Sequence, residues 1–234
     1  MPKSTKRSKP KNRPITEEEA QRAIYLDFEG RGAPHGQPAP PPVLGGTLIE
    51  GEYTDTIVSE ELAQVALGRS REFVPLEEYL EDLLRRARAE SRRIVYWTSH
   101  EAELFEQHGF PPGGLGFDLK IDVRPHMKDL FKESREARKA LRTAKSKTAR
   151  EKARRKAFGL CVECAERHGF KTPTSYSRGQ VGIIIKRALD QASKRPDYES
   201  WPRGAKAAWS RLVTHNKADC EAMELLMPLY GVRP

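Results

Sequence analysis

The segment "RAIYLDFEGRG", residues 22–32, places the carboxylates Asp27 and Glu29 two positions apart at the end of a short apolar run. Residues two apart in a β-strand face the same side, so both carboxylates point one way, with Tyr25, while the intervening apolar residues point toward a core. Two carboxylates this close repel each other unless a proton or a cation lies between them. Mg²⁺ prefers such oxygen ligands and bridges to phosphate, so the pair indicates a metal site. The alternative is the solvated polar face of an edge strand.

Two later segments add polar side chains that could join this pair. In "RIVYWTSHEAELFE" a predicted strand leads into a helix capped by Ser99, with Glu101 in the first turn, where the helix dipole favours a carboxylate. In "RLVTHNKADCEAMELL" His215 and Asp219 are four apart and share the helix face that carries the apolar residues. An inward-facing Asp needs a partner or a metal. Ordinary capping by Glu101, and a His–Asp pair satisfied within the core, are the alternatives.

The three segments, in this order, resemble the DnaQ-like, or DEDD, 3′–5′ exonuclease superfamily, which has an RNase H-like fold. The closest resemblance is to the YprB-type group of predicted RNase H-like nucleases. It is carried by "YLDFEG", "VYWTSHEAELFE" and "LVTHNKADCEAMELL", with "SYSRGQVGIIIKRAL" ahead of the last of these. The resemblance spans residues 22–230, except that 132–170 has no counterpart in it.

The resemblance implies a role for each matched position. Asp27, Glu29, Glu101 and Asp219 would be the metal ligands, and His215 would orient or deprotonate the attacking water. Glu101 stands where the superfamily usually has Asp. His215 precedes Asp219 by the spacing that is usual for a Tyr, with three residues between them, whereas a His usually has four.

These residue types suit phosphodiester hydrolysis. Two Mg²⁺ or Mn²⁺ ions about 3.5–4 Å apart stabilise both the attacking and the leaving oxygens, and four carboxylates offset their charge. A histidine titrates near neutrality in its reference state and can accept a proton from water. Asp122 and Tyr176 are auxiliary candidates. The alternatives are a nucleic-acid-binding protein on an inactive nuclease scaffold and an RNase H-fold endonuclease. The residues do not distinguish DNA from RNA, or single from double strands.

Hydrophobic periodicity and turn residues predict the elements that must position these side chains. Strands are predicted at 23–28, 43–50, 52–59, 93–97 and 117–123, and helices at 75–90, 99–109, 126–167, from near Ser177, and at 204–230. This pattern predicts an α/β protein with an RNase H-like fold, in which a mixed central β-sheet of three antiparallel and then parallel strands is flanked by helices.

The net charge of +9 is concentrated in two stretches. Residues 1–14 carry +6 and residues 133–157 carry +8, so the rest of the chain is mildly acidic. We predict a disordered basic arm at 1–15, a nuclease domain at 16–234, and within it a basic helical insertion at 132–170. Such runs are typical of nucleic-acid partners, although solvated helices have them too. Six side chains are predicted to contact phosphate: Lys186, Arg142, Lys145, Arg150, Arg154 and Arg155.

The remaining features limit other functions. Cys161, Cys164 and His168 share one helix side, but without a fourth ligand nearby a zinc site is less expected than buried thiols. Trp97, Tyr176 and Trp201 could stack on bases, although we expect at least two of the three in the core. No apolar run is long enough to span a bilayer, and no secretory signal or disulfide framework is expected. The chain therefore reads as soluble, cytoplasmic and not membrane-bound.

Overall fold

The computed structural model describes residues 13–32 and 39–233. Its centre is a five-stranded mixed sheet in the order β3-β2-β1-β4-β5. The first three strands are antiparallel, and β1 pairs with β4, and β4 with β5, in parallel. The strands are β1 (Ile24–Glu29), β2 (Leu44–Ile49), β3 (Glu52–Ile57), β4 (Ile94–Tyr96) and β5 (Gly116–Asp118). The α/β class and the mixed sheet are thus as predicted.

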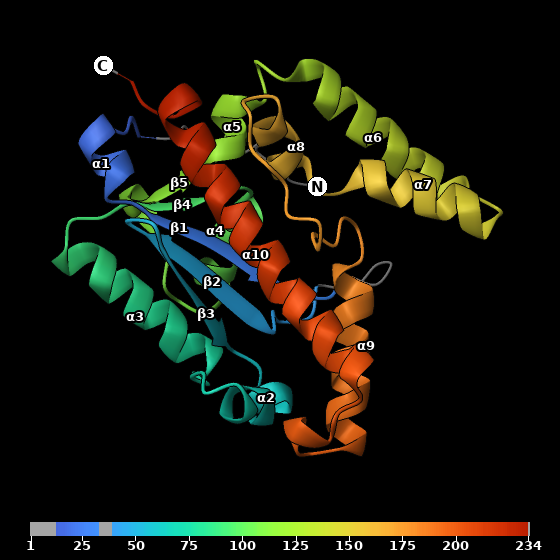
Figure 1. The fold of residues 1–234 in the computed structure, drawn as a ribbon. Helices are drawn as coiled ribbons and strands as arrows, with labels where there is room; N and C mark the ends of the chain where they lie inside the picture. Colours follow the sequence, from blue (N-terminus) through green and yellow to red (C-terminus); the bar gives the residue numbers. More distant parts are fainter. Residues whose placement is uncertain (1–12, 33–38, 234) are drawn as a thin grey trace, which may run out of the picture.

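Helices cover both faces of this sheet (Figure 1). One face packs on α3 and α4, and the other on the long α10 together with α5 and α8. The remaining helices are α1 and α2, the paired α6 and α7, and α9 beside α10. Their bounds are α1 (Glu17–Gln21), α2 (Ala63–Gly68), α3 (Leu76–Ala89), α4 (Ser99–Gln107), α5 (Leu119–Val123), α6 (Lys128–Thr143), α7 (Lys147–Ala157), α8 (Leu160–Glu166), α9 (Val181–Lys194) and α10 (Arg203–Tyr230).

Alternation along β1 sets the site's orientation. Ile24 and Leu26 pack with α3, whereas Tyr25 packs on the opposite face with α10. Because side chains alternate across a strand, Asp27 and Glu29 lie on the α10 side, as their spacing predicted. The strand therefore delivers both carboxylates to the helix that carries His215 and Asp219.

Two adjacent glycines in β2 let helices approach the sheet from both sides. A Cβ on Gly45 would lie 2.7 Å from the Tyr79 ring on α3, and one on Gly46 would lie 1.5 Å from Asn216 Oδ1 on α10. Real Cβ atoms do not approach heavy atoms this closely, so each glycine is required by a packing contact.

Short elements depart from the sequence prediction. The strand predicted at 117–123 ends at Asp118, whose side chain accepts from Lys120 N and begins helix α5. Asp122, which lies in the segment predicted as a strand, is therefore a helical residue. Thr98, rather than Ser99, caps α4. Helix α9 begins at Val181, four residues after the predicted start, because residues 178–180 form a turn.

The boundary predicted at residue 15 between the basic arm and the domain lies too far along the chain. Residues 1–12 lie outside the described part of the chain, but Ile15 is fully buried and bridges in parallel to Val232. Thr16 then begins α1 with a capping box formed with Glu19. Pro14 O also accepts from Arg93 Nη1 at 3.3 Å, so residues 14 and 15 both contact the domain.

The basic segment is an antiparallel helix pair, α6 and α7, that extends beyond the sheet (Figure 1). We call it the basic hairpin (residues 128–157). Its inner seam contains Ala137 and Ala153, and its base is held by Ser134 Oγ and Arg138 Nε, which donate to Ala157 O at 3.1 and 3.2 Å. The predicted insertion at 132–170 also includes α8, but α8 packs in the core against α10.

Candidate metal centre

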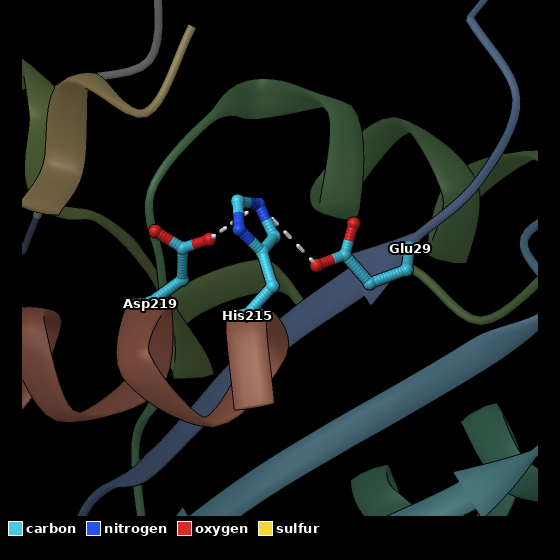
Figure 2. Close-up of side chains that lie close together, drawn as sticks. All are labelled: Glu29, His215 and Asp219. Carbon is cyan, nitrogen blue, oxygen red and sulfur yellow. Dashed lines mark ion pairs between the residues drawn. The ribbon is translucent and has the colours of Figure 1, made fainter. Parts of the chain in front are cut away.

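Three side chains converge where the end of β1 meets the middle of α10. Figure 2 shows His215 between Glu29 and Asp219. His215 Nε2 lies 3.3 Å from Asp219 Oδ2 and 3.8 Å from Glu29 Oε1. One ligand atom from each residue falls within 4.8 Å of the others, which is close enough for a single cation to contact all three. The sheet and the last long helix thus bring together side chains almost 190 residues apart.

Asp27 is fixed beside this group by Asn216, a residue that the sequence analysis missed. Asn216 Nδ2 donates to the Asp27 carboxylate at 2.8 Å and to the Asp27 carbonyl at 3.0 Å, while its Oδ1 accepts from Tyr53 Oη at 2.8 Å. Asn216 is fully buried, so all its bonds are made within the protein. The sequence did contain a signal for Asn216: the i, i+3, i+4 periodicity of α10 places it on the inward-facing side of the helix, beside His215 and Cys220.

Glu101 lies buried at the N-terminus of α4, with its carboxylate bound to its own helix cap. Its Oε2 accepts from Thr98 N at 3.2 Å and from Thr98 Oγ1 at 2.8 Å. The contacts of Glu101 are therefore those of a helix-capping residue, which is one of the two roles considered for it. The Glu101 charge nevertheless contributes to raising the pKa of both Asp27 and Glu29. The four acids Asp27, Glu29, Glu101 and Asp219 are called the acidic cluster below.

The acidic cluster has little compensating charge: among the described residues only His215 lies within ion-pair distance of its carboxylates, and Arg178 acts on Asp219 from farther away. Burial is the largest cause that raises the pKa of Asp27 and of Glu29, and the neighbouring carboxylates raise both further. Burial also raises the pKa of Asp219 to about 7 and lowers the pKa of His215 to about 4, with Arg178 adding to the latter effect. The ring is therefore neutral at pH 7, and cannot neutralise the acids.

Two buried polar atoms at the centre, Glu29 Oε1 and His215 Nδ1, have no hydrogen-bond partner within residues 13–32 and 39–233. A buried polar atom without a partner costs free energy, and a buried carboxylate without a counter-charge costs more. A divalent cation would supply Glu29 with a counter-charge. It would also offset the repulsion among the carboxylates of the acidic cluster, because each of them would be attracted to the cation. The residues present therefore fit Mg²⁺ or Mn²⁺, which prefer carboxylate oxygens.

Tyr176 lies inside this centre, whereas Asp122 does not. The Tyr176 ring stacks on His215 with ring centroids 4.1 Å apart, and Tyr176 Oη donates to Asp219 Oδ1 at 3.0 Å. Asp122 is instead ion-paired with Arg233 near the end of the described chain. Of the two auxiliary candidates, Tyr176 is the one placed to act on His215 and Asp219.

The segment that carries Tyr176 is anchored by Arg178, which the sequence analysis also missed. Its Nη1 lies 2.8 Å from Glu163 and its Nη2 lies 3.2 Å from Glu166, both on α8. The guanidinium also lies 5.9 Å from the Tyr176 ring centroid. Through these contacts α8 holds Tyr176 against His215.

A pocket of about 560 Å³ opens onto the centre. Asp27, Glu29, His215 and Asp219 line one part of it, and three basic side chains line another: Lys120, Arg138 and Arg154. Only Arg154 was among the six predicted phosphate contacts. The other five are exposed and lie outside the pocket lining: Lys186, Arg142, Lys145, Arg150 and Arg155. We call this space the site pocket.

The cysteines and tryptophans are mostly core residues. Cys161 and Cys164 are buried between α8 and α10, while His168 Nε2 lies 2.7 Å from Tyr230 Oη. These three side chains do not gather into a potential metal site. Trp201 is buried in the core beside α9 and α10, and Trp97 packs on Phe131 at the edge of the site pocket.

We expect the metal-free protein to become more stable as the pH falls from 8 to 6.5. The pKa of Asp219 is raised to about 7 by burial, and an Asp in an unfolded chain titrates near 3.9. Across this interval the folded state therefore takes up a proton that the unfolded state does not, which stabilises it. His215 opposes this gain only near and below its unfolded pKa of about 6.5, because burial lowers its folded pKa.

The measurement is the melting temperature in EDTA at both pH values. We expect a gain on the order of 1 kcal/mol, since the raised pKa values of Asp27 and Glu29 act in the same direction. Saturating Mn²⁺ should reduce this pH dependence, because a bound cation keeps the carboxylates ionised. A metal-free protein that melts at a lower temperature at pH 6.5 would contradict the expectation.

Comparison of the chain with protein-family models, with curated proteins and with solved structures finds no match to any of them. In the described residues, no helix has the length and apolar character that crossing a bilayer requires.

Proposed function

We propose that this protein is a divalent-metal-dependent nuclease with an RNase H-like fold, acting as a 3′–5′ exonuclease of the DnaQ-like type. The observation that carries the proposal is the acidic cluster, which is buried at Glu29 and Glu101 and half-buried at Asp27 and Asp219. Among the described residues its carboxylates have no ion-pair partner other than His215, and Glu29 Oε1 and His215 Nδ1 at its centre have no hydrogen bond. The strand order, with three antiparallel and two parallel strands, is compatible with the proposed fold. Exonuclease polarity rests on the sequence resemblance.

In this proposal Asp27, Glu29 and Asp219 hold Mg²⁺ or Mn²⁺ directly, and Glu101 completes the set from the N-terminus of α4. The bound ions would supply a nucleophilic hydroxide at neutral pH and stabilise charge on the phosphate oxygens. Asn216 fixes the carboxylate of Asp27 through its 2.8 Å bond, so that this ligand does not have to be ordered when metal binds.

His215 is assigned to proton transfer. A neutral imidazole can accept a proton, and burial keeps the pKa of His215 low. Tyr176 restrains the ring by stacking on it and restrains Asp219 by a hydrogen bond. These two contacts position the acceptor beside the acidic cluster.

The test is cleavage of oligonucleotides labelled at the 3′ or the 5′ end, as single and double strands of DNA and RNA, with Mg²⁺, Mn²⁺ or EDTA. We expect metal-dependent removal of nucleotides from the 3′ end. Cuts at internal positions would instead favour the RNase H-fold endonuclease. Tight, salt-sensitive binding without any cleavage would favour the alternative of a binding protein on an inactive scaffold.

Residues 1–12 provide a separate test of the basic arm. Their removal should weaken nucleic-acid binding and reduce its salt dependence, because five basic residues are lost while Arg13 and Pro14, which contact the domain, are kept. Metal-dependent cleavage should persist. Loss of all cleavage at low salt would contradict a role limited to binding.

A further inference from the structure

The site pocket is lined by apolar side chains as well as by carboxylates. Phe158, which follows α7, is 43% exposed, and Ile183, on α9, is 52% exposed. They are two of the five large apolar side chains exposed in the described residues, and both line the site pocket. Exposing such side chains is unfavourable, and their concentration beside one cluster indicates a ligand surface.

The same pocket carries positive charge. Lys120, Arg138 and Arg154 line it, and the Arg138 guanidinium lies 5.5 Å from the Phe158 ring centroid. Burial lowers the pKa of Lys120, and the charges of Asp118 and Glu101 act against that shift. An occupant of this space must therefore offer anionic groups next to a flat apolar surface.

A nucleotide with an unpaired base has this combination. Phosphates match the basic side chains, and an exposed base face can stack on an aromatic ring. Bases inside a duplex have both faces covered by their neighbours, so they cannot use Phe158 in this way. An apolar peptide would leave the three basic side chains without partners, and a free phosphate would leave Phe158 and Ile183 exposed.

We propose that the site pocket selects single-stranded ends, with an unpaired base against Phe158 and Ile183 and the adjacent phosphates at Lys120, Arg138 and Arg154. This inference rests on the proposed function for the location of the scissile bond. The basic hairpin is thereby a specificity element, since it supplies Arg138 and Arg154 and is followed directly by Phe158.

The test is binding of fluorescent oligonucleotides by the full chain in Ca²⁺, measured by anisotropy. The probes are a single strand, a blunt duplex of the same sequence, and single strands of DNA and of RNA with an abasic nucleotide at either end. We expect Phe158→Ala to weaken single-strand binding about tenfold, since stacking of a base is worth about 1–3 kcal/mol. The substitution should not change the binding of the duplex, nor that of the one abasic-ended probe that lacks the base expected to stack on Phe158.

Two further variants control for folding and for general loss of apolar surface. Phe158→Trp should retain single-strand binding, because the indole also stacks. Leu229→Ala removes another exposed apolar side chain, one that lies outside the site pocket, and should bind like the wild type. Equal binding by wild type and Phe158→Ala, or duplex binding as tight as single-strand binding, would overturn the inference.

The two proposals fail in different ways. A protein that binds single strands through Phe158 but never cleaves them contradicts the nuclease and keeps the binding inference. A protein that degrades single and double strands equally, and whose Phe158→Ala variant has unchanged kcat and KM, keeps the nuclease and contradicts the inference.

Discussion

Replacing Asp27 by Asn is expected to abolish metal-dependent cleavage and, at the same time, to raise the thermal stability of the metal-free protein. The carboxylate is half-buried beside Glu29, Asp219 and Glu101, and its burial and these neighbours raise its pKa. Asparagine keeps an acceptor for the Asn216 bond but removes a negative charge from the cluster. The variant therefore loses repulsion and a metal ligand together.

The expected loss of cleavage is on the order of 10³-fold, because several kcal/mol of transition-state stabilisation depend on a bound metal. The expected gain in stability at pH 8 in EDTA is about 1 kcal/mol, or about 2–4 °C in Tm for a chain of this size. Addition of Mn²⁺ should raise the Tm of the wild type and leave that of Asp27→Asn almost unchanged.

Asp122→Asn is the matched control. Asp122 is also a buried carboxylate, but it is ion-paired with Arg233. Its replacement removes a compensated charge, so it should lower stability modestly and leave cleavage intact. A destabilised Asp27→Asn variant that still cleaves would show that Asp27 is a structural residue.

The second large effect is expected from Gly46→Ala. The added Cβ would lie 1.5 Å from Asn216 Oδ1 and 2.9 Å from Tyr53 Oη, so α10 or the Asn216 side chain must move. Either movement breaks the bonds that Asn216 makes to Asp27 and Tyr53. We expect the free energy of unfolding to fall by about 3 kcal/mol, which is at the upper end for an overpacked core. Cleavage should be lost as well.

Gly114→Ala provides the control, because its Cβ would have no neighbour within 4 Å. The double variant Gly46→Ala with Asn216→Ala should be less destabilised than the sum of the two single variants, because each removes one side of the same contact. Chemical denaturation gives the free energy of unfolding of the wild type and of the four variants. Additive effects, or a Gly46→Ala variant as stable as Gly114→Ala, would contradict the packing seen between β2 and α10.

The sequence was sufficient for features set by local periodicity. The alternation in β1 predicted which side Asp27 and Glu29 face, and the four-residue spacing in α10 predicted that His215 and Asp219 share a face. These predictions succeeded because strand and helix geometry relate residues close in sequence. The segment at 117–123 failed because seven residues of mixed character fit a strand as well as a short helix, and the Asp118 cap decides between them.

Long-range contacts were outside the reach of periodicity. Nothing in the segment containing Asn216 indicates that its amide will bond Asp27 in another element. Likewise, the need for glycine at two positions of β2 is explained only by the helices that pack on them. The basic hairpin shows the same limit. Its charge was visible in the sequence, but which of its cations line the site pocket depends on how α6 and α7 pair, and Arg138 was therefore missed.

The most direct test of the metal-dependent hydrolytic centre is a comparison of two variants on α10 with the wild type. Asp219→Asn alters the acidic cluster, whereas Glu221→Gln alters a partly exposed acid that pairs with Lys217. A single-stranded oligonucleotide labelled at its 5′ end is incubated with excess protein and increasing Mn²⁺. We predict metal-dependent shortening by the wild type and by Glu221→Gln, and none by Asp219→Asn. No cleavage by the wild type at any Mn²⁺ concentration, or equal cleavage by Asp219→Asn, would contradict the assignment.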